Sequence, residues 1–364
     1  MNRLDVWIDD ASLGGSALIG RLTKTANRTG DTISFEYDAG WLAGAGPVAA
    51  FPLDHALHLG AGPHYAKAGA SALSGIFQDG APDRWGQRLM DRREAIEARE
   101  AGRKVRNLRA RVIWSASMTR PAWARCVSWM RSPIITWTIA RSASRRPPSC
   151  ASLKRSPLTS SAATPICPAE MVRWIKQIVA PGASLGGARP KASFRDPSGQ
   201  LWLAKFPSLD DRIDVGLWEY LTYQLSRDAG IDMPEAKLMQ LSDRGHTYAV
   251  QRFDRTPTSR RMFSSADATG RRRERGCSYL DLVRAIETSG TSTQIARELE
   301  QLFRRVLFNI LIGNRDDHLR NHGFLRVGDG WQLSPAFDVN PNRTRIITCS
   351  PSTIGTHRPI RACC

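Results

Sequence analysis

Acidic and amide side chains near the end of the chain are spaced as phosphate chemistry would need them. Asp316 is followed by Asn321 and then by Asp338. A carboxylate can orient an attacking hydroxyl, while an amide oxygen and a second carboxylate are hard donors that suit Mg²⁺ on nucleotide phosphates. We therefore predict phosphoryl transfer, with Asp316 at the acceptor hydroxyl and Asn321 and Asp338 as magnesium ligands. The alternative is an ordinary loop of capping residues, where Asp and Asn are also common.

His318 lies inside the same loop. An imidazole can donate and accept hydrogen bonds, so we group His318 with the catalytic residues as the side chain that fixes the shape of the loop.

A second set of polar residues lies upstream, in a glycine-bearing loop ahead of an expected strand. It contains Ser184, Gly186, Gly187 and Lys191. Glycines let backbone N–H groups approach phosphate oxygens, and a lysine adds positive charge. We predict a phosphate-binding loop here, with a plain hairpin turn as the alternative.

Lys205 and Glu219 are candidates for the charge pair beside the nucleotide. Lys205 belongs to an apolar stretch at 201–206 that predicts a strand, and Glu219 to a helical pattern at 215–228. A strand lysine can contact ATP phosphates and a helix glutamate can hold it, as in protein kinases. Taken alone, Lys205 more often indicates a surface lysine at a strand end. The order of these residues relative to the Asp316 loop favours the phosphate-binding role.

Gln251 and Phe253 lie at the end of the last strand expected in this half of the chain. Backbone groups at this point could contact adenine, and the Phe253 ring could line the adenine pocket. For Phe253, packing in the core is the alternative.

The elements that must position these residues predict an α+β protein. Alternating or apolar runs predict strands at 4–8, 33–37, 201–206, 237–241, 247–253, 323–325 and 330–333. The helix at 215–228 carries Leu217, Tyr220, Leu221 and Leu225 on one face. Further helices are expected at 171–179 and from 279 onward.

The last of these helices precedes the Asp316 loop and ends at Gly313, a residue suited to a C-terminal cap. Its period predicts a buried stripe of Ile295, Leu299, Leu302, Phe303, Val306, Leu307 and Ile310.

The net charge of +18 is confined to two segments. No Asp or Glu occurs in residues 101–169 or 339–364, which hold 13 and 4 of the 52 Lys and Arg; 35 basic residues remain against 34 acidic ones. Six of the seven cysteines lie in the same segments. We interpret both as out-of-frame translation of a GC-rich gene. A genuine basic arm that binds DNA is the alternative.

The length of 364 residues allows two or three domains. The chain has no apolar run long enough to span a membrane and no secretory signal at its start, so we expect a cytoplasmic protein without a membrane partner.

With these residues in place, the chain resembles the HipA family of toxin serine/threonine kinases. The resemblance rests on Phe77–Trp85, Ser184–Lys191, Lys205, Val250–Arg255, Asn314–Phe324 and Ser334–Asn340. It implies an α+β, two-lobed protein-kinase-like fold with a small N-terminal mixed α/β subdomain, and ATP and Mg²⁺ as cofactors. By the same resemblance, Lys205 contacts ATP, Gln251 and Phe253 form the hinge, and Ser184 is autophosphorylated.

The resemblance also implies partners. Family members phosphorylate a Ser or Thr of a protein in translation, such as an aminoacyl-tRNA synthetase. A helix-turn-helix antitoxin neutralises them, so DNA is contacted only indirectly through that protein. The alternative function is a non-catalytic corepressor that binds the antitoxin.

We expect five segments: an N-terminal subdomain at 1–100, the anomalous segment 101–169 without stable structure, a small lobe at 170–256, a partial large lobe at 257–340, and an anomalous tail at 341–364. An incomplete helical lobe would expose apolar surface along 295–310. We therefore expect poor solubility and weak or absent activity.

Overall fold

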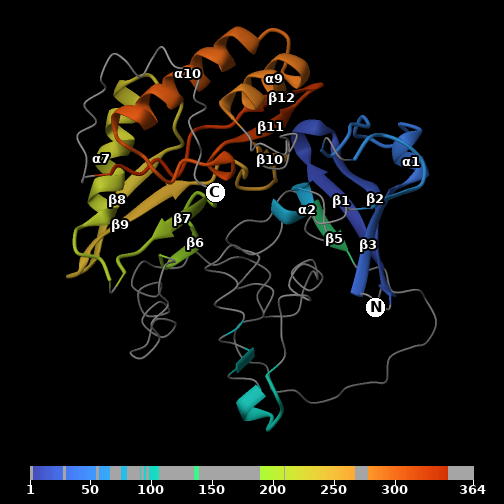
Figure 1. The fold of residues 1–364 in the computed structure, drawn as a ribbon, viewed down its shortest axis with the longest axis horizontal. Helices are drawn as coiled ribbons and strands as arrows, with labels where there is room; N and C mark the ends of the chain where they lie inside the picture. Colours follow the sequence, from blue (N-terminus) through green and yellow to red (C-terminus); the bar gives the residue numbers. More distant parts are fainter. Residues whose placement is uncertain are drawn as a thin grey trace.

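The computed structural model describes residues 3–27, 30–54, 57–65, 75–79, 91, 94–95, 98–105, 135–138, 189–208, 210–266 and 278–342. Figure 1 shows an N-terminal module built on one sheet, a second sheet flanked by a helix, and two helices above a third sheet. Ser184, Gly186 and Gly187 lie outside the described residues, as does the helix expected at 171–179.

A five-stranded antiparallel sheet, in the order β4-β3-β2-β1-β5, forms the N-terminal module. Its elements are β1 (Arg3–Asp10), η1 (Ala11–Leu13), β2 (Gly15–Asn27), β3 (Gly30–Tyr37), α1 (Ala39–Leu42), β4 (Pro63–Tyr65), α2 (Gly75–Asp79) and β5 (Ile135–Thr138). Leu4, Val6 and Ile8 alternate inward along β1 and are almost fully buried, as a half-buried strand requires. The strands expected at 4–8 and 33–37 are confirmed.

Strand β5 belongs to the stretch 101–169 that the charge distribution sets apart. It pairs with β1, and Ile135 lies opposite Ile8. Apart from β5, only residues 101–105 of that stretch are described, so the proposed segment boundaries stay predictions.

The small lobe is a four-stranded antiparallel sheet in the order β6-β7-β9-β8. Its elements are β6 (Lys191–Arg195), β7 (Leu201–Lys205), α7 (Val215–Asp228), β8 (Ala236–Ser242) and β9 (Gly245–Gln251). Helix α7 approaches β9 closely at Gly216, where an added Cβ would lie 2.1 Å from the carbonyl oxygen of His246. Asp214 caps the helix by accepting from the backbone N–H of Leu217.

The buried face of α7 is polar and aromatic rather than aliphatic. Glu219, Thr222, Tyr223 and Ser226 turn inward. The leucines of the predicted apolar face, Leu217, Leu221 and Leu225, are exposed. The buried face of α7 is therefore the one that carries Glu219, and not the leucine face that the hydrophobic pattern of the helix indicates.

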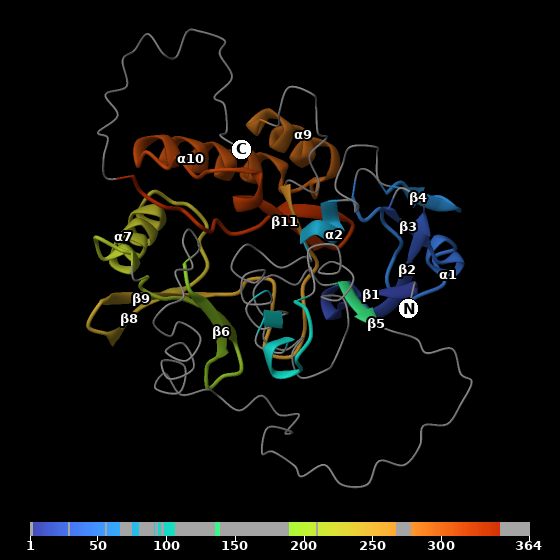
Figure 2. The same ribbon diagram turned by 60° about the horizontal axis from the view of Figure 1, so that its bottom comes forward.

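The large lobe has a three-stranded antiparallel sheet, β10-β11-β12, under two helices. Its elements are β10 (Phe263–Ser265), α9 (Tyr279–Ser289), α10 (Ile295–Leu311), η2 (Leu319–Asn321), β11 (Gly323–Val327) and β12 (Gly330–Leu333). Leu282, Ile286, Leu302 and Phe324 form its core. The turned view in Figure 2 places α9 and α10 on one side of β11.

The predicted stripe on α10 is only partly buried. Leu302 is 2% exposed, but Phe303 is 66% and Leu307 is 45% exposed, and Leu311 continues the exposed row. The prediction of burial was therefore wrong for Phe303 and Leu307, because these two residues face away from the sheet that covers Leu302. The expectation of exposed apolar surface along this helix is confirmed.

The loop after α10 begins at Gly313, which has a φ of 65°, as expected for a residue after a helix end. The chain then crosses η2, forms the β11–β12 hairpin and returns through 334–338 toward the small lobe. There the N–H of Ala336 donates to the carbonyl oxygen of Asp232 at 2.8 Å. Within the described residues, no helix is long and apolar enough to cross a membrane.

Candidate active site

A buried lysine joins the two lobes. Lys205, at the end of β7, forms ion pairs through Nζ with Glu219 of α7 and with Asp338 of the large lobe. Burial alone would lower the pKa of Lys205, but the carboxylates of Asp338 and Glu219 outweigh it and raise the pKa above its usual value. Lys205 is therefore held as a cation at the junction of the lobes, and the alternative of a surface lysine is wrong.

Asp338 has a strained backbone. Its φ is 55°, and among the described residues it is the single non-glycine residue whose φ is positive. Such conformations cost about 1–3 kcal/mol and persist where the surroundings enforce them, which is common at functional sites. The side-chain amide of Asn340 donates to the Asp338 carbonyl oxygen at 3.1 Å, which helps to hold this turn.

The loop after α10 presents Asp316 at the surface. The N–H of Asp316 donates to the side-chain oxygen of Asn314 at 3.2 Å, and the side-chain amide of Asn321 donates to the Asp316 carbonyl oxygen at 2.8 Å. These bonds fix the backbone on both sides of the carboxylate. Asp316 is exposed, so a hydroxyl from another molecule can reach it.

A neighbouring carboxylate that the sequence analysis missed orders this loop from behind. Asp317 accepts hydrogen bonds from Tyr279 Oη and from Asn309 Nδ2, the latter at 2.9 Å, and contacts His322 Nε2 at 2.9 Å. Burial alone would raise the pKa of Asp317, but the bonds from His322 and Tyr279 outweigh it and hold the pKa below its ordinary value. Asp317 therefore stays ionised as the anchor of the loop.

His322 also fixes this loop, whereas the loop-fixing role of His318 stays a prediction. His322 is buried and packs its ring edge-on against Tyr279, with centroids 5.7 Å apart. In the part of the chain that is described, Nδ1 of His318 is buried without a hydrogen-bond partner. In the sequence, the doublet Asp316–Asp317 followed by a second histidine could have pointed to Asp317 and His322 as residues that fix the loop. The sequence alone does not say which of the two carboxylates is buried.

The hinge role of Gln251 and Phe253 stays a prediction, and two backbone donors of this segment are already used. The N–H groups of Gln251 and Arg252 donate to the carbonyl oxygens of Glu235 and Leu201, each at 2.8 Å. Adenine would therefore have to bind through other groups of this segment. The Phe253 ring packs against Phe337, with centroids 5.6 Å apart, and its place in an adenine pocket stays a prediction.

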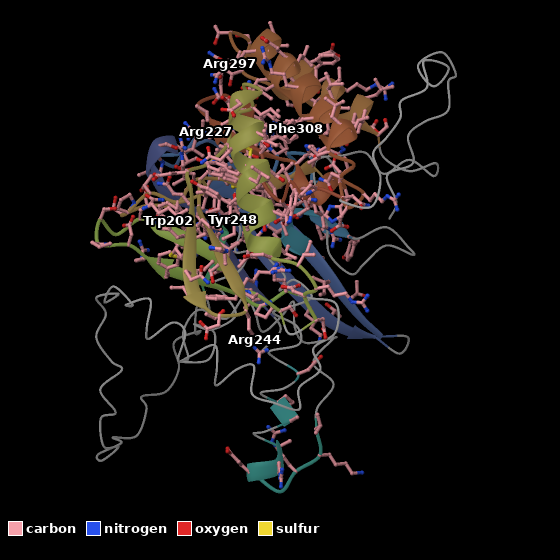
Figure 3. All side chains as sticks on the ribbon, turned by 90° about the vertical axis from the view of Figure 1, so that its left-hand side faces the viewer. Trp202, Arg227, Arg244, Tyr248, Arg297 and Phe308 are labelled. Atoms are coloured by element: carbon pink, nitrogen blue, oxygen red, sulfur yellow. The ribbon has the colours of Figure 1, made fainter. Side chains whose placement is uncertain are left out.

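Lys191 lies directly opposite Lys205 across the β6–β7 ladder. Directly opposed residues of an antiparallel pair point to the same face of the sheet, so both lysines share one face. Figure 3 views the lobes from the side on which α7 crosses the small-lobe sheet beside Tyr248. Nearby, Arg189, which the sequence analysis missed, donates to Asp211 Oδ1 at 2.7 Å.

The two proposed magnesium ligands line one pocket. Asn321 and Asp338 both border one small pocket between the loop and α10, together with Asp317 and Arg305. Their amide and carboxylate oxygens suit Mg²⁺, which usually takes one or two protein ligands and fills its shell with phosphate and water. Within the described ranges, no three His, Cys, Asp or Glu side chains gather into a metal cluster. The two residues fit a phosphate-bound ion rather than a protein-enclosed one.

Arg305 is a buried cation in the wall of this pocket. Its side chain donates through Nη2 to the Ser334 carbonyl oxygen at 2.6 Å, while Nε and Nη1 have no partner among the described residues. Burial lowers the pKa of Arg305 to about 10, against the opposing effect of Asp232 and Glu298.

The second half of the chain is similar in sequence to known proteins. Residues 183–357 match the family of HipA-like C-terminal domains. A candidate kinase of Sinorhizobium fredii, Y4dM, is 29% identical over 160 residues, which cover 39% of this chain and 37% of that protein. A candidate kinase of Haemophilus influenzae is 26% identical over 136 residues, which cover 33% of this chain and 39% of that protein. The matched regions thus span about two fifths of these curated relatives.

The fold is also similar to a solved structure of a toxin–antitoxin system from Shewanella oneidensis MR-1, containing HipA, HipB and operator DNA. The TM-score is 0.59 at 17% identity, over 90% of this chain and 75% of that one. The predicted α+β kinase-like fold is confirmed. Residues 183–357 of this chain thus match the HipA-like C-terminal domain family, and the fold of the chain is similar to that of a HipA-containing structure.

Proposed function

We propose that this chain is built as an ATP- and Mg²⁺-dependent serine/threonine protein kinase. The observation that supports it most strongly is the ion-paired set of Lys205, Glu219 and Asp338, which links both lobes. Asn321, from the loop that carries the exposed Asp316, lines one pocket with Asp338. A structural salt bridge alone would not require an exposed Asp316 fixed from both sides, or a strained Asp338.

Each residue has a separate role in the proposed reaction. Lys205 binds the ATP phosphates, and Glu219 keeps the lysine oriented. Asp316 accepts a hydrogen bond from the Ser or Thr hydroxyl, whose oxygen forms a bond to the γ-phosphorus while the bond to the ADP oxygen breaks. The hydroxyl proton passes to Asp316 late in transfer. Mg²⁺, held by Asn321 and Asp338, would neutralise charge on the phosphates.

The proposal extends to the regulation of the kinase and to its partners. We place autophosphorylation at Ser184, where added negative charge would repel ATP phosphates. A helix-turn-helix antitoxin is the proposed partner, supported by the fold similarity to the HipA of a complex that contains HipB and operator DNA. DNA contact would then be indirect, and the substrate would be a protein in translation.

The test measures Mg²⁺-ATP binding and phosphate transfer by the purified chain and by Asp316→Asn. We expect the variant to bind ATP normally and to lose transfer by a factor of about 10²–10⁴, the contribution of a positioned base. The matched control is Asp329→Asn, on an exposed turn of the β11–β12 hairpin. Absence of ATP binding in the unmutated protein, or equal transfer by both variants, would contradict the proposal.

A further inference from the structure

Strand β10 lies at the edge of its sheet and connects the N-terminal module with the active-site loop. On one side it pairs with β11, placing Ser265 opposite Gly323. The N–H of Ala266 continues this side by donating to the carbonyl oxygen of His322 at 2.9 Å. The backbone of β10 therefore contacts the loop that carries Asp316.

The other side of β10 is held by two carboxylates of the N-terminal module. Asp10, at the end of β1, accepts from the N–H of Met262 through Oδ2 at 2.6 Å. Asp79, at the end of α2, accepts from both the N–H and the hydroxyl of Ser265, each at 2.7 Å. Asp10 is fully buried. Edge-strand N–H groups without a neighbouring strand need such partners.

The side chain of Phe263 extends this contact into the active site. Its ring lies 5.7 Å from that of Phe253 and 6.2 Å from that of Phe337, measured between centroids. It also packs so closely over Gly323 that an added Cβ there would lie 2.3 Å from the ring. Phe337 directly precedes Asp338, whose backbone is strained. A shift of β10 would therefore move the residues around Asp338.

We propose that Asp10 and Asp79 are positioning residues for phosphate transfer, because they hold β10 and, through Phe263, fix Phe337 and the Asp338 backbone. Neither carboxylate needs to touch ATP. The N-terminal module is then a working part of the kinase site. This inference rests on the proposed kinase function only for its kinetic readout.

The test compares Asp79→Asn and the milder Ser265→Ala with the unmutated chain. Hydrogen exchange is measured at 262–266 and 336–340, together with the KM for ATP and the KM for the protein substrate. Loss of a charge-assisted hydrogen bond should raise exchange in both segments about tenfold. We expect the KM for ATP to rise by a similar factor, with the KM for protein substrate unchanged. Ser265→Ala should give a smaller change in the same segments.

The control is Asp5→Asn, which breaks an ion pair with Arg21 at 3.1 Å on β1 and β2 without touching β10. Exchange at 336–340 that matches the control would overturn the inference. So would an even rise across all elements, including β8 and β9, because that indicates general destabilisation. Hydrogen exchange can be measured without kinase activity. If the chain does not bind ATP, the proposed kinase function is wrong, but the exchange data still show whether β10 is coupled to Asp338.

Discussion

Asp316 and Asp317 are neighbours in the sequence with opposite environments. The first is exposed and held through its backbone, whereas the second receives side-chain bonds from Tyr279, Asn309 and His322. An exposed carboxylate can meet a substrate hydroxyl, and a buried one can fix a loop. The division of roles depends on which donors surround each side chain, not on residue type.

Replacing Asp317 by Asn should destabilise the chain by about 2–3 kcal/mol at pH 7, the scale of hydrogen bonds to a charged group. The pKa of Asp317 is lowered in the folded state. Its contribution is therefore present above about pH 4 and is lost as the pH falls through the folded pKa. Urea unfolding of the chain and of Asp317→Asn at pH 7 and pH 3 should show a smaller difference at pH 3. A difference that does not change with pH would rule out this role for the charge.

At the scale of elements, α10 has one apolar face that is buried and another that is exposed. Leu302 packs into the large-lobe core, while Phe303, Leu307 and Leu311 form an exposed apolar row on the opposite face. A period of 3.6 identified the helix and its end at Gly313, but a wide apolar stripe does not reveal which of its edges another element covers. The exposed leucines of α7 show the same limit.

Substituting Phe303 and Leu311 by Ser should change the free energy of unfolding by less than about 1 kcal/mol, because exposed positions contribute little. The double variant should remain soluble at higher concentration and bind less of a hydrophobic dye. Leu302→Ala, on the buried face, should cost about 2–5 kcal/mol. A comparable loss of stability in the double variant would show that this face is covered in solution.

At the scale of the whole molecule, the N-terminal module and the large lobe share core residues. Met262, just before β10, is fully buried in the core of the N-terminal module, and Trp331 of β12 packs against the same core. The two parts are thus joined by apolar burial as well as by Asp10 and Asp79. We expect them to unfold together.

Met262→Ala should lower stability by about 2–5 kcal/mol, as for other buried large-to-small changes. Hydrogen exchange under mild denaturant should then rise together in β1 and in α9, because a shared core makes the transition cooperative. Met239→Ala, at a half-buried site on β8, is the matched control. Loss of protection in β1 alone would show that the module and the lobe unfold independently.

The hydrophobic period of the sequence was enough to predict most strands and the helix at 215–228. The order and spacing of the residues were enough to propose that Lys205 and Glu219 act together with the Asp316 loop. The short edge strand β10 escaped detection, because Phe263–Ser265 contains only one apolar residue and shows neither alternation nor an apolar run. Contacts between residues far apart in sequence decided the rest: Lys205 with Asp338, Asp79 with Ser265, and Tyr279 with Asp317. Side-chain burial and hydrogen-bond partners depend on which surfaces meet, and only the tertiary structure determines that.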